Sequence, residues 1–253
     1  MSVIASPEPQ TPPADDVHPL DHAVWFSLTG PLASFAEGSS QALRFRPDVS
    51  PFAAFAPGAG DAGWAALFEV VKPGDSVAVF GTSGPPPGRL PAGWQRGEAG
   101  PGRQLVATEA FRSGPDAEAV PLGPDDVEEM LDLVARTRPG PFAAGTYRLG
   151  GYLGIRREGA LVAMAGQRLH PPGYVEISAV CTDPAVQGQG LGTRLIRAVA
   201  HGIREAGDVP FLHAAAVNTS AIRLYEKLGF TLRRSIDFCG LANQGSPELG
   251  HPS

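Results

Sequence analysis

The chain has 253 residues, of which 43% are hydrophobic and 18% charged, a composition typical of a globular protein with a buried core. Its 26 acidic and 20 basic residues give a formal net charge of −6, which predicts no general surface for nucleic acids. No stretch approaches the ~20 apolar residues that span a bilayer, and the first residues lack the order of a signal peptide. Cys181 and Cys239 form neither a disulfide framework nor a metal-binding spacing, so we expect a protein of the reducing cytoplasm without membrane or nucleic-acid partners.

The first part of the chain is predicted to fold without a motif of chemical specificity. Residues 1–19 are rich in proline and acidic side chains, and we expect a disordered tail there. Residues 20–116 contain many large apolar side chains and are expected to form a small α/β domain. The elements expected within it are a helix (62–71), two strands (76–80 and 104–108) and a proline- and glycine-rich loop (84–103).

A second domain is expected over residues 117–240, and its boundary lies within a segment at 113–125 whose composition is typical of a linker. We expect its fold class to be α+β, with a mixed α/β sheet. The predicted elements are a helix from Val127, an antiparallel hairpin (152–156 and 160–167), a buried strand (175–181), an amphipathic helix from Leu191, a buried strand (210–217), a helix (219–228) and a last strand (230–238). Residues 241–253 are expected to be a flexible tail.

The stretch from Val175 to Gly192 organises this domain, since a buried strand leads through a glycine loop into a helix. A P-loop needs Gly-Lys-Ser/Thr where this chain has Gly192-Thr193-Arg194, and the third glycine of a dinucleotide-binding loop would stand at Thr193. What remains is a general property: backbone amides at the start of a helix attract a pyrophosphate, and glycines allow it to approach closely. A simple turn before a helix is the alternative.

A wider pattern is more specific than the loop. The motif Gln187-x-x-Gly190-x-Gly192 follows an apolar strand, and after a helix and a further strand come Asn218 and the motif LYEKLGF at 224–230. This order resembles the GCN5-related N-acetyltransferase (GNAT) family, and within it the FR47-like branch, over roughly residues 120–238. The resemblance implies the GNAT acyl-CoA N-acyltransferase fold for the second domain. A degenerate copy of the same fold is one interpretation of the first domain, although it shows neither motif.

The resemblance implies that acetyl-CoA, as a co-substrate and without a metal, gives its acetyl group to a primary amine by direct attack. An alkyl amine has an ordinary pKa near ~10.4, so a base must take up a proton. Glu176, the charge in the central strand, lies where the histone acetyltransferases of the family carry their base, and burial is expected to raise its pKa. Its alternatives are exposure to solvent or an ion pair with an arginine such as Arg168. His213 is the rival base, its alternative is a core histidine, and the two side chains could also share the proton through water.

Further roles follow from the same resemblance. Backbone amides around Val180, Cys181 and Thr182 are expected to hold the oxyanion and the pantetheine arm. The loop expected to hold the pyrophosphate comprises Gln187, Gly188, Gln189, Gly190, Leu191, Gly192 and Thr193. Asn218 would bond the pantetheine or simply cap the next helix, and Tyr225 would protonate the departing thiolate or simply pack in the core. A covalent mechanism through Cys181 is disfavoured, because a cysteine in an apolar strand is usually inert.

The sequence therefore predicts an acetyl-CoA-dependent N-acetyltransferase for a small-molecule or peptide amine, which the segment Pro139–Thr146 would partly contact. The alternative is an acetyl-CoA-binding regulatory or protein-interaction module that has lost turnover. The identity of the acceptor stays open at this point, as does the choice between monomer and homodimer.

Overall fold

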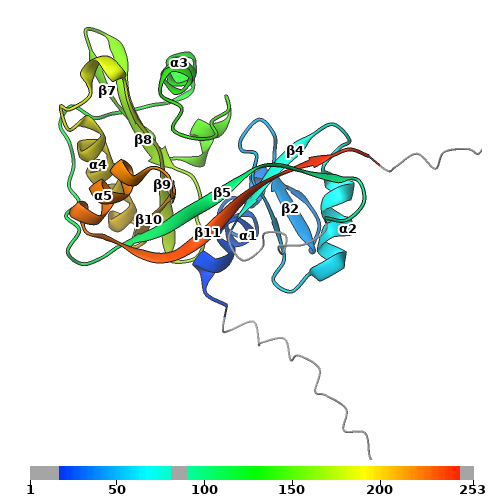
Figure 1. Cartoon of the computed structure of the whole chain (residues 1–253). Coiled ribbons are helices and arrows are strands. Elements are labelled where there is room, and N and C mark those ends of the chain that lie inside the picture. The colour runs from blue at the N-terminus through cyan, green and yellow to red at the C-terminus, as the bar shows by residue number, and fades with distance from the viewer. Residues whose placement is uncertain (1–16, 81–89, 246–253) are drawn as a thin grey trace, which may run out of the picture.

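One long mixed sheet runs through the protein in a computed structural model that describes residues 17–80 and 90–245 (Figure 1). Its eight strands follow the order β4-β11-β5-β10-β9-β8-β7-β6, and a separate small sheet has the order β1-β2-β3. The strands are β1 (Ala36–Gly38), β2 (Ala42–Phe45), β3 (Ala53–Phe55), β4 (Ser76–Phe80), β5 (Trp94–Ala107), β6 (Val120–Pro121), β7 (Leu153–Arg157), β8 (Ala160–Gln167), β9 (Tyr174–Thr182), β10 (Val209–Ala215) and β11 (Phe230–Asn243). The helices are α1 (Ala23–Leu28), α2 (Gly60–Val70), α3 (Val127–Thr137), α4 (Leu191–Glu205) and α5 (Thr219–Leu228), with short 3₁₀ turns at Pro19–His22, Ala33–Phe35, Pro124–Asp126, Thr146–Leu149 and Pro184–Val186. Among the described residues, no helix is both long and apolar enough to cross a membrane.

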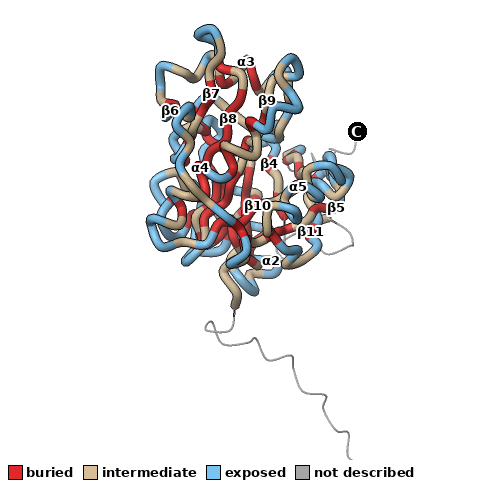
Figure 2. Tube along the Cα trace, turned by 90° about the vertical axis from the view of Figure 1, so that its left-hand side faces the viewer, coloured by how far each residue is buried: buried red, intermediate tan, exposed pale blue. Residues whose placement is uncertain are grey.

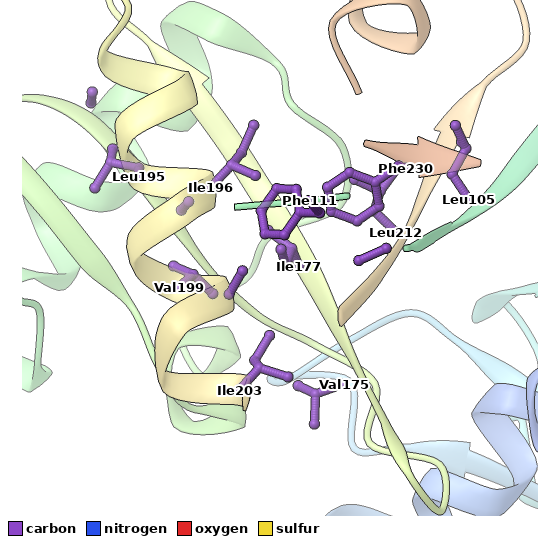
Figure 3. Close-up of a cluster of buried hydrophobic side chains, with 14 of the residues drawn as sticks. Leu105, Phe111, Val175, Ile177, Leu195, Ile196, Val199, Ile203, Leu212 and Phe230 are labelled. Carbon is purple, nitrogen blue, oxygen red and sulfur yellow. The ribbon is translucent and has the colours of Figure 1, made fainter. Parts of the chain in front are cut away.

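Helices α3 and α4 cover opposite faces of the sheet. Because side chains alternate between the faces of a strand, Ala163 and Ala165 of β8 pack with α4, whereas Met164 packs with α3. The apolar residues of α4 meet β9 in a cluster that Figure 3 shows: Leu195, Ile196, Val199 and Ile203 lie against Val175 and Ile177. Burial of each such aliphatic side chain stabilises the fold by about 1.5–3 kcal/mol. Figure 2 shows the buried residues gathered along β8, β9 and α4, so the strand expected to carry the chemistry lies within the core.

The long strands β5 and β11 connect the two ends of the molecule (Figure 1). They pair antiparallel from Phe230 opposite Ala107 to Asn243 opposite Trp94, and β11 also pairs with β4. Residues 20–116 thus contribute β4 and β5 to the same sheet as the second domain, and the boundary expected at 116/117 does not separate two sheets. The interpretation of the first domain as a degenerate copy stays a prediction.

The prediction of a loop over 84–103 is wrong for residues 94–103, which belong to β5. Residues 84–89 of that loop lie outside the described residues. One glycine of this strand, Gly102, marks a close approach rather than a loop. A Cβ on Gly102 would lie 2.3 Å from a ring atom of Phe238, so only glycine lets this ring cross the strand. Sequence composition could not reveal this, because the reason lies in a partner strand more than 130 residues away.

The ends of the chain and the expected linker also differ in part from the prediction. Strand β11 continues to Asn243, and Leu241 is buried, so the flexible tail expected from 241 cannot include residues 241–243. Residues 1–16 and 246–253 of the expected tails lie outside the described residues. The expected linker is tied to α4: Asp116 accepts two hydrogen bonds of 2.6 Å from Arg194, and the amide of Gly114 donates to the carbonyl of Arg197. The other predicted elements are found close to their expected bounds.

Candidate active site

A cleft opens where β9 and β10 separate. These strands pair in parallel over three positions, and Phe211 opposite Glu176 is the last of them. Beyond it lies a cavity of about 530 Å³, within the size range of ligand pockets. Its walls comprise Arg136, Thr137, Arg138, Pro139, Gly140, Arg168, Ile177, Ser178, Ala179, Val180, Cys181, Thr182, Pro184, Gln187, His213, Ala214, Ala215, Asn218 and Tyr225. We call the point at which β9 and β10 separate the fork. Its cleft brings together residues that the sequence singled out: Val180, Cys181, Thr182, Gln187, Asn218, Tyr225 and His213.

The edge of β9 that faces this cleft is bulged and unpaired. Between Ser178 and Cys181, two residues of β9 oppose one residue of β8, and Ala179 adopts a left-handed backbone with φ of 52°. For a residue other than glycine this conformation costs about 1–2 kcal/mol, which the neighbouring β8 pairing and the buried Ala179 side chain must offset. Since β10 has already diverged, residues 178–182 present backbone donors and acceptors to an extended ligand.

The glycine loop lies at the start of α4. Gly188 and Gly190 have φ of 82° and 75°, and a Cβ at either position would meet nothing within 4 Å, so the backbone conformation alone requires glycine. Gly190 caps α4 without a side-chain hydrogen bond, and the first amides of a helix have no acceptor within the helix. Leu191 is buried in the core, so only its backbone is available there. The loop offers exposed amides suited to an anion.

Glu176 is completely buried and fully paired. Its Oε2 accepts a hydrogen bond of 2.8 Å from Arg168 Nε, and its Oε1 accepts bonds from Arg168 Nη2 at 2.5 Å and His213 Nδ1 at 2.8 Å. Burial by itself would raise the pKa of this carboxyl, but the positive charge of Arg168 and the bond from His213 lower it to about 2. The prediction that burial raises the pKa of Glu176 is therefore wrong. The structure shows the alternative, an ion pair with Arg168.

His213 lies in direct contact with Glu176 rather than through a water. Its side chain is 1% exposed, and its Nε2 lies 3.0 Å from the amide nitrogen of Gln104. The rings of Phe80 and Phe211 lie edge-on at 4.9 and 5.5 Å. Both ring nitrogens are thus engaged, as expected for a satisfied core histidine, although its backbone borders the cleft.

Tyr225, Asn218 and Cys181 lie at the cleft, and each also has the contacts or the burial expected of a structural residue. Tyr225 borders the cleft, burial raises its pKa, and its ring packs 6.2 Å from that of Phe230. Asn218 caps α5, because its side-chain oxygen accepts a bond of 3.2 Å from the amide of Ala221. Burial raises the pKa of the Cys181 thiol to about 11, which keeps it protonated and a poor nucleophile.

Comparisons with known proteins agree on one family. The model of the FR47-like protein family matches residues 152–238. A crystal structure of a putative GNAT-family acetyltransferase from Novosphingobium aromaticivorans is 41% identical, with a TM-score of 0.82 over 90% of this chain and 100% of that one. The chain belongs to the GNAT family. Its fold and the resemblance noted in the sequence are thereby confirmed.

Curated relatives of this GNAT protein are named as acetyltransferases. Mycothiol acetyltransferase of Thermomonospora curvata is 30% identical over 222 residues, which make up 82% of this chain and 62% of the relative. N-alpha-acetyltransferase RimI of Mycobacterium tuberculosis is 40% identical over 82 residues, or 31% of this chain and 51% of the relative. The chain therefore spans only about half to three-fifths of the length of these two relatives.

The charge of the GNAT cleft was not foreseen from the sequence. Arg136, Arg138 and Arg168 border it, whereas no aspartate or glutamate is among the described residues that line it. Arg136 pairs with Asp132 and Asp183, and Arg168 with Glu176, but Arg138 forms no ion pair with any described residue. The sequence predicted that the segment Pro139–Thr146 contacts the acceptor, and Pro139 and Gly140 of that segment line the cleft, but Arg138 was not singled out.

Proposed function

We propose that this GNAT protein is an acetyl-CoA-dependent N-acetyltransferase that acts on a primary amine. One observation carries the proposal: the point where β9 and β10 separate, the open bulged edge of β9 and the glycine loop before α4 follow one another without interruption. Together they suit a long, thin molecule with an amide-bearing arm and a pyrophosphate. The family relationship supports the same conclusion, since the relatives are named acetyltransferases.

Two groups of residues fit acetyl-CoA. Backbone groups of residues 178–182 would bond the pantetheine arm in the manner of an added strand, and amides of Gly188–Thr193 would hold the pyrophosphate. The bound acetyl-CoA would supply the thioester carbonyl that the amine attacks. Backbone amides near Val180 would donate hydrogen bonds to the developing oxyanion.

The base is reassigned on the basis of the ion pair. A carboxylate with a pKa of about 2, whose oxygens all accept hydrogen bonds, takes up a proton poorly near neutral pH. We therefore assign the uptake of the amine's proton to water in the cleft. Glu176 and His213 are assigned a structural role, which is to hold β9 and β10 together. Direct proton uptake by Glu176, or by His213, is the competing assignment.

Tyr225 is the proposed acid. Its raised pKa keeps the phenol protonated at neutral pH, so it can donate a proton to a thiolate that leaves within the cleft. Cys181 remains a thiol and takes no covalent part.

The acceptor is proposed to be a small-molecule or peptide amine without a cluster of positive charges. The arginines around the cleft disfavour a polycation, even though the whole chain is acidic. The names of the relatives give two first choices, an amine of a mycothiol-like thiol and the α-amine of a peptide.

The decisive experiment combines binding and turnover. Thermal unfolding with acetyl-CoA, NAD or ATP should show stabilisation by acetyl-CoA, and thiol release with a panel of thiol amines and peptides should reveal turnover. Stabilisation by acetyl-CoA without turnover on any amine would support the alternative, a regulatory binding module. Stabilisation by NAD alone would contradict both functions.

A further inference from the structure

A row of polar side chains crosses four neighbouring strands and reaches the cleft at His213 and Arg168. Arg233 of β11 bonds Gln104 of β5 at 2.8 Å, Gln104 lies 3.0 Å from His213 of β10, and His213 bonds Glu176 of β9 at 2.8 Å. Arg168, just beyond β8, closes the row on Glu176. Every contact joins neighbours in the sheet order, so the row links the N-terminal strand β5 to the cleft.

The strand register explains why Gln104 reaches His213. The two residues stand directly opposite each other in the antiparallel pair of β5 and β10. Arg233 is the extra residue of a bulge in β11 between Leu232 and Arg234, which turns its guanidinium towards Gln104 and Asp21.

The row has one self-consistent hydrogen-bond direction. An arginine only donates, so Gln104 Oε1 accepts from Arg233 and the amide nitrogen points to the carbonyl of Leu20 at 2.9 Å and to His213 Nε2. Because that amide nitrogen only donates, His213 Nε2 must accept. The imidazole proton therefore sits on Nδ1, from which it is donated to Glu176 Oε1.

This bond lies where the cleft begins. Backbone pairing of β9 and β10 stops at Phe211 opposite Glu176, and His213 is two residues farther along β10. The His213–Glu176 bond thus holds the two strands together just after their backbones part. We infer that Gln104 is a positioning residue of the cleft, which fixes His213 as its Nδ1–H tautomer and thereby fixes the His213–Glu176 bond at the fork.

The contribution of the N-terminal region to the cleft follows from this inference. Gln104 and the carbonyl of Leu20 both come from residues before the expected domain boundary. A doubly protonated His213 would place two donors face to face at Gln104, and rotating that amide would break its bonds to Leu20 and Arg233. The surroundings therefore oppose any other state of the imidazole.

Nitrogen-15 NMR of the histidine rings in the whole chain tests the tautomer directly, with His213→Gln to assign the signals. We expect the imidazole proton on Nδ1 and an unprotonated Nε2 in the wild type. Gln104→Glu replaces the donor by an acceptor, so His213 should acquire a proton on Nε2. Arg103→Met is the matched control, because Arg103 precedes Gln104 but bonds Ser235 on the exposed side of the strand. It should leave the His213 signals unchanged.

Kinetics add a second readout that rests on the proposed function. Gln104→Glu should raise the KM for acetyl-CoA on the order of tenfold, since it disturbs a buried hydrogen-bond network at the fork, whereas Arg103→Met should not. Should Gln104→Glu fail to fold, Arg233→Met should mix the two tautomers and Arg233→Lys should restore the original one. A wild-type His213 with its proton on Nε2, or unchanged signals in Gln104→Glu, would overturn the inference. A protein without acetyl-CoA turnover but with the expected tautomer would contradict only the proposed function.

Discussion

Glu176 and His213 are joined by a 2.8 Å hydrogen bond across the point at which β9 and β10 separate. This bond and those from Arg168 engage the carboxylate that the sequence offered as a candidate base, with an ion pair to Arg168 as the alternative. The same three side chains define the first predictions, because a buried charge network determines stability as well as chemistry.

Glu176→Gln should lower the free energy of unfolding by about 3–5 kcal/mol. It leaves the guanidinium of Arg168, whose side chain is 11% exposed, without its counter-charge, which is costly for a largely buried cation. Urea unfolding monitored by tryptophan fluorescence measures the loss. Glu118→Gln is the control, since Glu118 pairs with Arg157 and Arg194 at the surface and its loss should change stability little.

The base assignment gives a separate kinetic prediction. Glu176→Gln and His213→Ala should alter kcat to similar extents and leave the slope of kcat/KM against pH unchanged between pH 6 and 9. This is expected because neither group titrates as the base in our assignment. Loss of a pH-dependent limb in one variant alone would identify that residue as the base after all.

The depressed pKa of Glu176 predicts how stability depends on acid. Its ordinary value is 4.5 and its folded value about 2, so the carboxylate contributes stability above about pH 4.5 and loses it as the pH falls towards 2. The shift corresponds to about 3 kcal/mol. Between pH 7 and pH 3, the urea midpoint should fall further for the wild type than for the double variant Glu176→Gln/Arg168→Met, which lacks the ion pair. Equal acid sensitivity of the two proteins would count against a carboxylate held ionised by Arg168.

Tyr225→Phe should lower kcat by about 10²–10⁴-fold if the phenol is the acid. The ring still packs beside Phe230, so acetyl-CoA should raise the melting temperature as much as in the wild type. The rate is measured as the release of the thiol from acetyl-CoA. A variant that turns over at the wild-type rate would leave Tyr225 with packing as its only role.

Gly190→Ala should destabilise the fold by about 1 kcal/mol and weaken acetyl-CoA binding, because alanine resists the backbone φ of 75° at the start of α4. Gly202→Ala is the matched control within the same helix. It has helical backbone and open space for a Cβ, so it should stabilise the protein by about 0.5–1 kcal/mol and leave binding unchanged. Thermal shifts with and without acetyl-CoA measure both effects.

The sequence by itself determined the elements of the second domain and the residues along its cleft. Periodicity located β9, α4, β10 and α5, since burial of one face imposes a regular apolar pattern. The motif Gln187-x-x-Gly190-x-Gly192 and the motif LYEKLGF at 224–230 marked the family. Few residue types can replace Gly190 in the first motif, because its backbone φ is positive.

Only the tertiary structure decided the state of Glu176 and the reach of the N-terminal region. The pKa of a buried carboxylate rises or falls according to the charged and hydrogen-bonding groups within a few ångströms of it. For Glu176 these groups are Arg168 and His213, which come from other segments of the sheet. Likewise, glycine-rich residues 94–103 form a strand because β11 supplies their partners and Phe238 fills the space above Gly102. Local composition encodes propensity, but long-range pairing overrides it wherever a distant strand supplies the hydrogen bonds and the packing.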